Sequence, residues 1–182
     1  MKKVAMFLVD EFEDSEALVV RDLLLRAELK VDSIALFETK TITSAHGLTI
    51  QADYLFDEVK LGSYDAYFLP GGKGTVHYYL SNALHKRLEK ALAQHKLIAA
   101  ICAAPSYLAG TGLLSDYKAT CYPTYEKELL DNDVILVKDK VVVDDNIITG
   151  QAMGSCIEFG LAMIEYLCGK EKMKGIAKSI CF

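Results

Sequence analysis

The segment "LIAAICAAPSYLAG" places Cys102 where a short apolar run meets an alanine-rich run. A residue at a sharp strand-to-helix turn is pushed out of the sheet edge, as in the nucleophile elbow of hydrolases. Small neighbours such as Ala103 and Ala104 permit a tight turn, and Pro105 suits the first turn of a helix. The N-terminus of that helix would favour a thiolate, which predicts a nucleophilic Cys102. The alternative is an inert core cysteine.

A second turn, Pro70-Gly71-Gly72, ends the apolar run "DAYFLPGG". Glycine lets the backbone come close to a ligand and turn its N–H groups toward it. The N–H groups of Gly72 and Ala103 are therefore predicted to form an oxyanion hole for charge that develops on a carbonyl oxygen. The alternative is a plain tight turn.

The stretch "DEFEDSEA" carries five carboxylates, of which Glu16 is the last. Asp10, Glu11 and Glu13 are typical of a solvated helix start. Glu16 leads directly into an apolar stretch, and we expect it to face inward. A carboxyl group buried beside a thiolate has its pKa raised, and in its protonated form it would donate a hydrogen bond to the sulfur.

Tyr122, at the end of "KATCY", is the polar group best placed to approach Cys102, unless it is simply a packed aromatic. Among the histidines, His46 and His77 follow segments that could reach the same region. His85 and His95 fall on the exposed side of an amphipathic helix.

The chain alternates short apolar runs with helical patterns. Strands are expected in "KKVAMFLV", "KVDSIALFE", "DAYFLPGG", "KLIAAIC" and "KATCY", a ribbon in 41–51, and two or three further strands in 133–150. Helices are expected in 15–29, 81–95, from Ala104, in 153–169 and at the end of the chain. This order predicts one domain over 1–182, with a parallel sheet covered on both faces. Ligands bind beyond the carboxyl ends of such strands, where Cys102, Gly72, Tyr122 and the segment before Glu16 should converge.

Composition excludes several classes of protein. The net charge of -5 argues against a nucleic-acid partner. Five cysteines without a C-x-x-C pair argue against a disulfide framework and a thiolate zinc site, and indicate a reducing cytoplasm. No apolar run approaches the roughly 18 residues of a membrane helix. We expect chemistry without a metal or cofactor.

Five segments, in this order, resemble the ThiJ/PfpI superfamily over nearly the whole chain: "FEDSEAL", "YDAYFLPGG", "LIAAICAAP", "LLSDYKATCYP" and "GSCIEFGLAMIEYL". The resemblance implies a flavodoxin-like three-layer sandwich with a mostly parallel sheet. It also implies that Cys102 is the reactive elbow cysteine, that Glu16 is its acid partner, and that Gly72 and Ala103 are the oxyanion donors. Members usually form homodimers, often through the first helix.

The chain departs from this family at two positions. Members with hydrolase-like or deglycase activity commonly have a histidine where this chain has Tyr122, and a phenol is a poor general base at neutral pH. Where the family frequently has an anion-binding arginine, this chain has Ala45-His46. Tyr122 and His46 are therefore the candidate auxiliary residues.

The leading hypothesis is a cysteine-dependent enzyme that acts on small reactive carbonyls, such as methylglyoxal, or on their glycated adducts. The second is a redox sensor or stress chaperone whose Cys102 is oxidised to sulfinic acid. A third, an amidotransferase- or peptidase-like hydrolase, requires a histidine that Tyr122 does not supply. A binding module without chemistry predicts a Cys102 that does not react with iodoacetamide at neutral pH.

Overall fold

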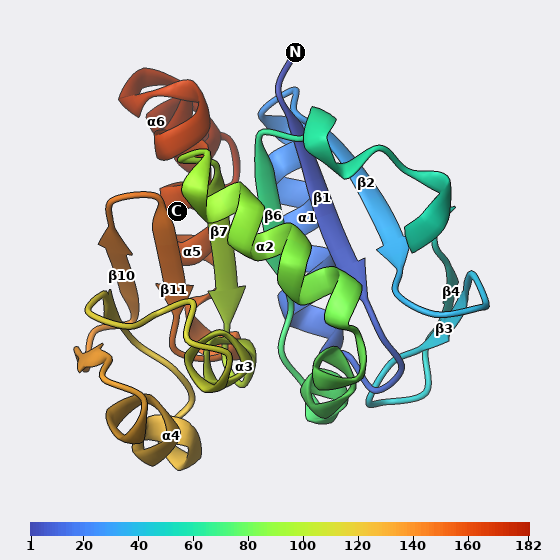
Figure 1. Ribbon diagram of the computed structural model, residues 1–182. Coiled ribbons are helices and arrows are strands. Elements are labelled where there is room, and N and C mark those ends of the chain that lie inside the picture. The colour runs from blue at the N-terminus through green and yellow to red at the C-terminus, as the bar shows by residue number, and fades with distance from the viewer.

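A seven-stranded sheet forms the centre of the protein, which the computed structural model describes over residues 1–182 apart from the side chain of Leu61. Neighbouring strands are parallel, except that β10 is antiparallel to β11. In Figure 1 the arrowheads of β1, β2 and β7 point the same way, so their carboxyl ends share one edge. The strands in spatial order are β10 (Val141–Asp144), β11 (Ile147–Gly150), β7 (Leu97–Ile101), β6 (Ala66–Leu69), β1 (Lys3–Leu8), β2 (Lys30–Ala35) and β5 (Tyr54–Leu55).

Helices cover both faces of this sheet, with α2 in front of it and α1 behind it in Figure 1. The α-helices are α1 (Asp14–Arg26), α2 (Asn82–Ala93), α3 (Ala104–Gly110), α4 (Glu126–Asp131), α5 (Cys156–Cys168) and α6 (Lys170–Ser179). The 3-10 helices are η1 (Phe56–Glu58), η2 (Leu61–Ser63), η3 (Lys73–Leu80), η4 (Pro123–Tyr125) and η5 (Met153–Ser155).

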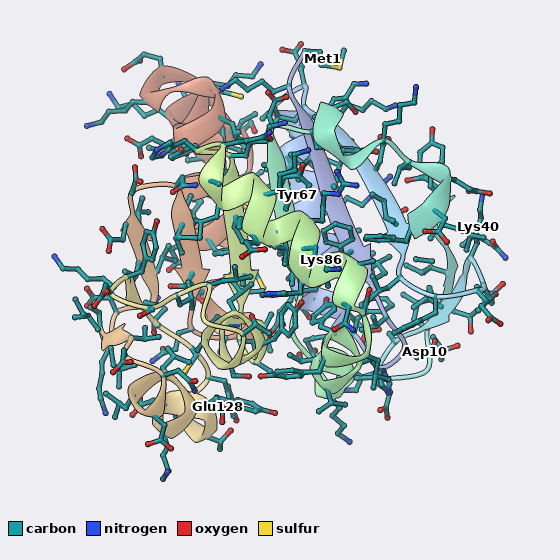
Figure 2. All side chains as sticks on the ribbon, viewed as in Figure 1. Met1, Asp10, Lys40, Tyr67, Lys86 and Glu128 are labelled. Carbon is teal, nitrogen blue, oxygen red and sulfur yellow. The ribbon has the colours of Figure 1, made fainter. Side chains whose placement is uncertain are left out.

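Two apolar cores separate the three layers, because successive residues of a strand point to opposite faces. Met6 and Leu8 of β1 pack in the core that contains α1, α5 and α6. Ala5 and Phe7 of the same strand pack in the core that contains α2, α3 and α4. Tyr67, labelled in Figure 2, belongs to this second core. Burial on both faces explains why the strands read as continuous apolar runs, and it confirms the predicted three-layer α/β fold.

The predicted strand over "KATCY" is wrong in length and in place. Strand β8 covers only Lys118–Ala119 and pairs with β9 (Ile135–Leu136) in a separate two-stranded sheet. The position next to β7 is taken by β11, whose four residues are all buried. The following residues still reach the edge of the main sheet, since the Tyr122 N–H donates to the Cys102 carbonyl at 2.8 Å.

A hairpin of β3 (Thr41–Thr43) and β4 (Thr49–Gln51) confirms the predicted ribbon. The hairpin packs against the loop that follows β1, where the Asp10 side chain accepts a hydrogen bond from the Thr43 N–H at 2.8 Å. Asp10 is labelled in Figure 2, close to the end of β1. None of the described helices is both long and apolar enough to cross a bilayer.

Candidate active site

Cys102 lies between β7 and α3 with a φ of 63°, a conformation that non-glycine residues seldom adopt. Its N–H donates to the Gly150 carbonyl at 2.9 Å, and its carbonyl accepts from Tyr122, so both backbone groups are fixed. The side chain is half-buried. This is the geometry of a nucleophile elbow, and the strain indicates a functional position.

The loop before α1 is held against the Pro70-Gly71-Gly72 turn by backbone hydrogen bonds. The Glu13 N–H donates to the Gly71 carbonyl at 3.0 Å, and Phe12 forms an isolated antiparallel bridge with Gly72. Gly72 has a φ of 99°, and a Cβ there would lie 2.5 Å from the Glu11 carbonyl oxygen. The close approach of these two segments therefore requires glycine, and it brings the first turn of α1 to the elbow.

Glu16, in that first turn, is completely buried. Its Oε2 accepts a hydrogen bond from the Gly71 N–H at 2.9 Å, and its carboxyl group is hydrogen-bonded to the Cys102 thiol. Oε1 has no nitrogen or oxygen partner among the described residues. The predicted inward orientation of Glu16 is therefore what the structure shows.

The buried pair of Cys102 and Glu16 shares its protons. Burial raises the pKa of Glu16 to about 7, although hydrogen bonds from Cys102 and Gly71 act in the opposite direction. Burial and then the charge of Glu16 raise the pKa of the Cys102 thiol, whereas the N–H groups of Ala103 and Gly72 lower it. The start of α3 is thus insufficient to keep the thiol ionised. A thiolate would require that the thiol proton move to Glu16, whose pKa suits a general base at neutral pH.

The predicted catalytic, oxyanion and auxiliary residues line one cavity of about 620 Å³: Cys102, Glu16, Gly72, Ala103, Tyr122 and His46. The N–H groups of Gly72 and Ala103, the predicted oxyanion donors, are both hydrogen-bonded to the Cys102 sulfur. We call this space the Cys102 cavity. Its lining consists of Glu13, Glu16, His46, Gly72, Lys73, Cys102, Ala103, Tyr122, Thr124, Tyr125, Ala152, Met153 and Gly154.

Sequence reasoning missed part of this lining. Ala152, Met153 and Gly154 follow β11, so the rule of strand ends would have found them if "NIITG" had been placed beside β7. Lys73 follows the Gly-Gly turn directly, but nothing in its surroundings in the sequence distinguishes it from a surface lysine. His77 lies outside the lining.

Gly71 has no room for a side chain beside the buried pair of Glu16 and Cys102. A Cβ there would lie 2.6 Å from Glu16 Oε2 and 2.8 Å from both the Cys102 Cβ and the Ile101 carbonyl oxygen. The turn was recognised in the sequence, but the contact of Gly71 with Glu16 joins residues 55 positions apart.

One group of the described side chains brings three cation-binding atoms within 4.8 Å of one another: Glu13, Asp14 and His46. Nδ1 of His46 already pairs with Asp14 at 2.8 Å, and exposed acids gather in this way without a metal. We treat the group as an ion-paired cluster.

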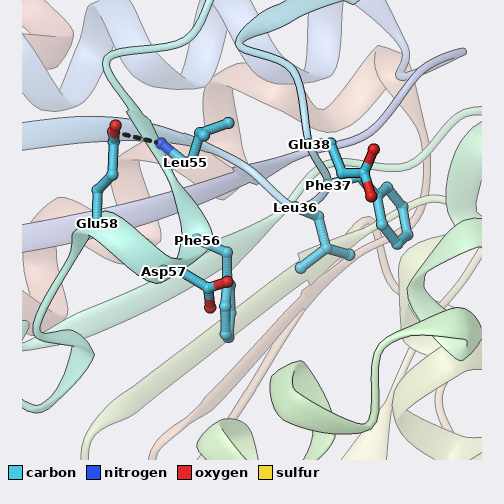
Figure 3. A pocket seen from close by; sticks show the side chains of 7 residues that line it. All are labelled: Leu36, Phe37, Glu38, Leu55, Phe56, Asp57 and Glu58. Atoms are coloured by element: carbon cyan, nitrogen blue, oxygen red, sulfur yellow. Dashed lines mark hydrogen bonds between the residues drawn. The ribbon is translucent and has the colours of Figure 1, made fainter.

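A second hollow, of about 450 Å³, lies beside the ends of β2 and β5 (Figure 3). There Glu58 accepts a hydrogen bond from the Leu55 N–H at 2.9 Å and pairs with Lys40 at 2.6 Å. The side chains drawn in Figure 3 include no thiol, hydroxyl or imidazole, so we assign the chemistry to the Cys102 cavity. The lining consists of Leu36, Phe37, Glu38, Leu55, Phe56, Asp57 and Glu58.

Comparison with known proteins identifies the family of this chain. A model of the DJ-1/PfpI family matches residues 2–166. The chain belongs to the DJ-1/PfpI family. This membership confirms the resemblance found in the sequence, and with it the flavodoxin-like fold.

DJ-1/PfpI relatives differ in length and in the activities they are named for. Protein DJ-1 homologs B and A of Arabidopsis thaliana are each 34% identical over 94% of this chain. The chain spans only 39% and 44% of the length of those two proteins. The glutathione-independent glyoxalase DJR-1.2 of Caenorhabditis elegans is 30% identical and is covered over 97% of its length, against 99% of this chain.

Solved DJ-1 structures superpose closely on the chain. The crystal structure of Drosophila melanogaster DJ-1beta has a TM-score of 0.94 and 34% identity, covering 99% of this chain and 97% of its own. The oxidized form of Toxoplasma gondii DJ-1 has the same TM-score and identity, and the match covers 100% of this chain and 99% of that structure.

Proposed function

We propose that the protein is a cysteine-dependent enzyme that converts small reactive carbonyls, with methylglyoxal as the simplest substrate, or that acts on their glycated adducts. One observation carries the proposal: a fully buried Glu16 with a pKa of about 7 is hydrogen-bonded to the Cys102 thiol at a strained elbow. A relative named as a glyoxalase and one named a deglycase, 35% identical over 79% of this chain, support the same reaction class.

In the proposed reaction, the Cys102 sulfur adds to the aldehyde carbon while its proton moves to Glu16. The N–H groups of Gly72 and Ala103 donate to the resulting oxyanion, which becomes the hydroxyl of a hemithioacetal. Glu16 then moves the proton on this carbon to the neighbouring carbonyl carbon, and the hydroxyl proton of the hemithioacetal passes to the oxygen of that carbonyl, which leaves an acyl thioester on Cys102. Water cleaves the thioester to release lactate and the free thiol. The atoms of one methylglyoxal and one water are therefore those of one lactic acid, and no oxidant or reductant is needed.

Incubation with methylglyoxal tests this proposal. We expect lactate from the wild type and none from Cys102→Ala, with Cys181→Ala as a matched control because Cys181 is exposed and lies outside the Cys102 cavity. Absence of lactate from the wild type, or equal lactate from Cys102→Ala, would overturn the proposal.

A second candidate function is redox sensing through the same sulfur. It is supported by the half-buried position of Cys102 and by the two N–H groups at its sulfur, which would hold the oxygens of a sulfinate. Mild peroxide followed by peptide mass spectrometry separates the two functions. Selective oxidation of Cys102 relative to exposed Cys181, without any aldehyde turnover, would favour the sensor.

We also propose a homodimer that forms through α1, as the family resemblance implies. Leu18, Val19 and Leu25 are exposed on this helix. Leu18 and Val19 also border a hollow of about 350 Å³ shared with Ile157 and Ile180. Sedimentation should show a dimer that Leu18→Glu dissociates, and a monomeric wild type would contradict this assignment.

A further inference from the structure

His46 is the one described histidine that lines the Cys102 cavity. His95 pairs with Asp145 at 3.5 Å, and His85 lines a separate hollow beside Tyr107. The residue that replaces the family's histidine, Tyr122, brings a phenol to this cavity. The imidazole of the site therefore belongs to the β3–β4 hairpin and not to the segment after β8.

The tip of the hairpin that carries His46 is fixed although the imidazole itself is exposed. The Ala45 N–H donates to the Phe12 carbonyl at 2.9 Å, and the Glu11 N–H donates to the Thr43 carbonyl at 2.8 Å. Buried Ser44 accepts hydrogen bonds from the N–H groups of His46 and Leu48 at 3.3 and 3.0 Å. The turn is thus held to the same loop that positions Glu16.

Asp14 orients the imidazole. Its Oδ2 lies 2.8 Å from His46 Nδ1, and its Oδ1 accepts a hydrogen bond from the Ser44 hydroxyl at 2.6 Å. Burial raises the pKa of Asp14, but the hydrogen bonds from Ser44 and His46 outweigh it and hold the pKa below its ordinary value. A carboxylate at Nδ1 keeps the proton on that nitrogen, so Nε2 of the neutral ring is free to accept one.

We propose that His46, oriented by Asp14, is the general base that activates water to hydrolyse the thioester on Cys102. This proposal rests on the proposed function, because that reaction is what forms the thioester. Glu16 is the group that serves the addition and isomerisation steps. His46 serves the hydrolytic step, and Asp14 is a positioning residue.

The step balances as follows. Water attacks the thioester carbon while Nε2 of His46 takes one of its protons, and the carbonyl oxygen becomes an oxyanion held by the Gly72 and Ala103 N–H groups. The carbon–sulfur bond then breaks, which releases the carboxylic acid and the Cys102 thiolate. The imidazolium returns its proton to the thiolate, and the acid loses its own proton to solvent.

Charged groups around His46 set the pH at which it works. The hydrogen bond to Asp14, and the charges of Glu13 and Asp14, raise the pKa of His46, while Lys73 from the start of η3 lowers it. Across the cavity lies the Cys102–Glu16 pair, with Tyr122 and Tyr125 beside it. The neutral imidazole is the base. The rate of hydrolysis should therefore increase with pH, with a midpoint above the pKa of an ordinary histidine.

The test separates hydrolysis from thioester formation. Cys102 is acetylated with p-nitrophenyl acetate, and loss of the acetyl group is followed by peptide mass spectrometry over a range of pH. We expect His46→Gln to slow this loss by about 100-fold. We expect Asp14→Asn to slow it about 10-fold and to move the acid limb of the profile to lower pH, because the group that raises the histidine pKa is gone.

His95→Gln is the matched control, because it also removes an imidazole paired with an aspartate, outside the cavity. The same variants are assayed for lactate from methylglyoxal, where His46→Gln should accumulate acyl-Cys102. Equal deacetylation by wild type and His46→Gln at every pH would overturn the role of His46, whether or not lactate forms. Deacetylation that depends on His46 in a protein that forms no lactate would support this role and reject the proposed function. A Cys102 that the ester never acylates would overturn the role.

Discussion

Two titratable pairs meet at the Cys102 cavity, the first with both members in its lining and the second with His46 alone, and burial makes the pairs chemically different. Glu16 is fully buried and bonded to Cys102, so desolvation dominates and raises its pKa. The side chain of His46 is 70% exposed and paired with Asp14, so hydrogen bonding and charge dominate its pKa. The buried pair is suited to passing a proton between its two members in a dry site, and the exposed pair to exchanging protons with water.

The largest expected effect concerns the buried pair and is a pH dependence of the protein's stability. The pKa of Glu16 is 4.5 in its ordinary state and about 7 in the folded protein. Since the folded state holds this proton more tightly, the free energy of unfolding should fall as pH rises from about 4.5 to about 7, and then level off. The contribution of this group is about 3 kcal/mol.

Urea denaturation at a series of pH values measures this effect. In Glu16→Gln the same component should be missing, because the amide does not titrate. A Gln variant with the same pH dependence as the wild type would show that Glu16 is not the buried acid responsible.

The next largest effect breaks the buried pair sterically. Gly71→Ala would place a methyl group 2.6 Å from Glu16 Oε2 and 2.8 Å from backbone, which we expect to cost about 1–3 kcal/mol. It should also separate Glu16 from Cys102 and abolish lactate formation.

Gly175→Ala is the control for this substitution, because Gly175 lies in α6 with open space around its Cα. It should leave stability unchanged or raise it slightly, since alanine favours a helix more than glycine does. Thermal denaturation that shows no difference between the two variants would contradict the close packing at Gly71.

A smaller effect concerns the shape of a rate profile. The alkylation rate of Cys102 by iodoacetamide should rise with pH to about 7 and then level off, because above that pH a thiolate forms by transfer of the remaining proton to Glu16. Without the carboxyl group, Glu16→Gln should show no plateau and should rise further into the alkaline range. Superimposable profiles would remove Glu16 from its proposed role.

The smallest expected effect distinguishes the exposed pair by its response to salt. At about 1 M salt the screening length falls to about 3 Å, so charges weaken between groups exposed to solvent. The pKa of His46, followed by NMR, should move back toward its ordinary value, whereas that of Glu16 should change little. A His46 pKa that is insensitive to salt would show that the surrounding charges add nothing to the hydrogen bond with Asp14, which is the largest cause of the shift.

Local pattern was sufficient for the fold and for the elbow. Strands buried on both faces appear as continuous apolar runs in the sequence. The position of Cys102 between such a run and an alanine-rich helix start therefore predicted the strand-to-helix turn. The inward position of Glu16 also followed from its place at the first apolar turn of α1. These features depend on residues close together in the chain, so periodicity and turn chemistry determine them.

Contacts between distant segments were decided only by the tertiary structure. The strand expected at "KATCY" is short because β11, later in the chain, occupies the position beside β7. Gly71 meets Glu16, and Asp14 meets His46, across 55 and 32 positions of sequence. The pKa values of both pairs depend on the burial and on the neighbours that these contacts create. The spacing of residues along the chain predicts neither the burial nor the neighbours, because both arise when the loop after β1, the glycine turn and the hairpin pack together.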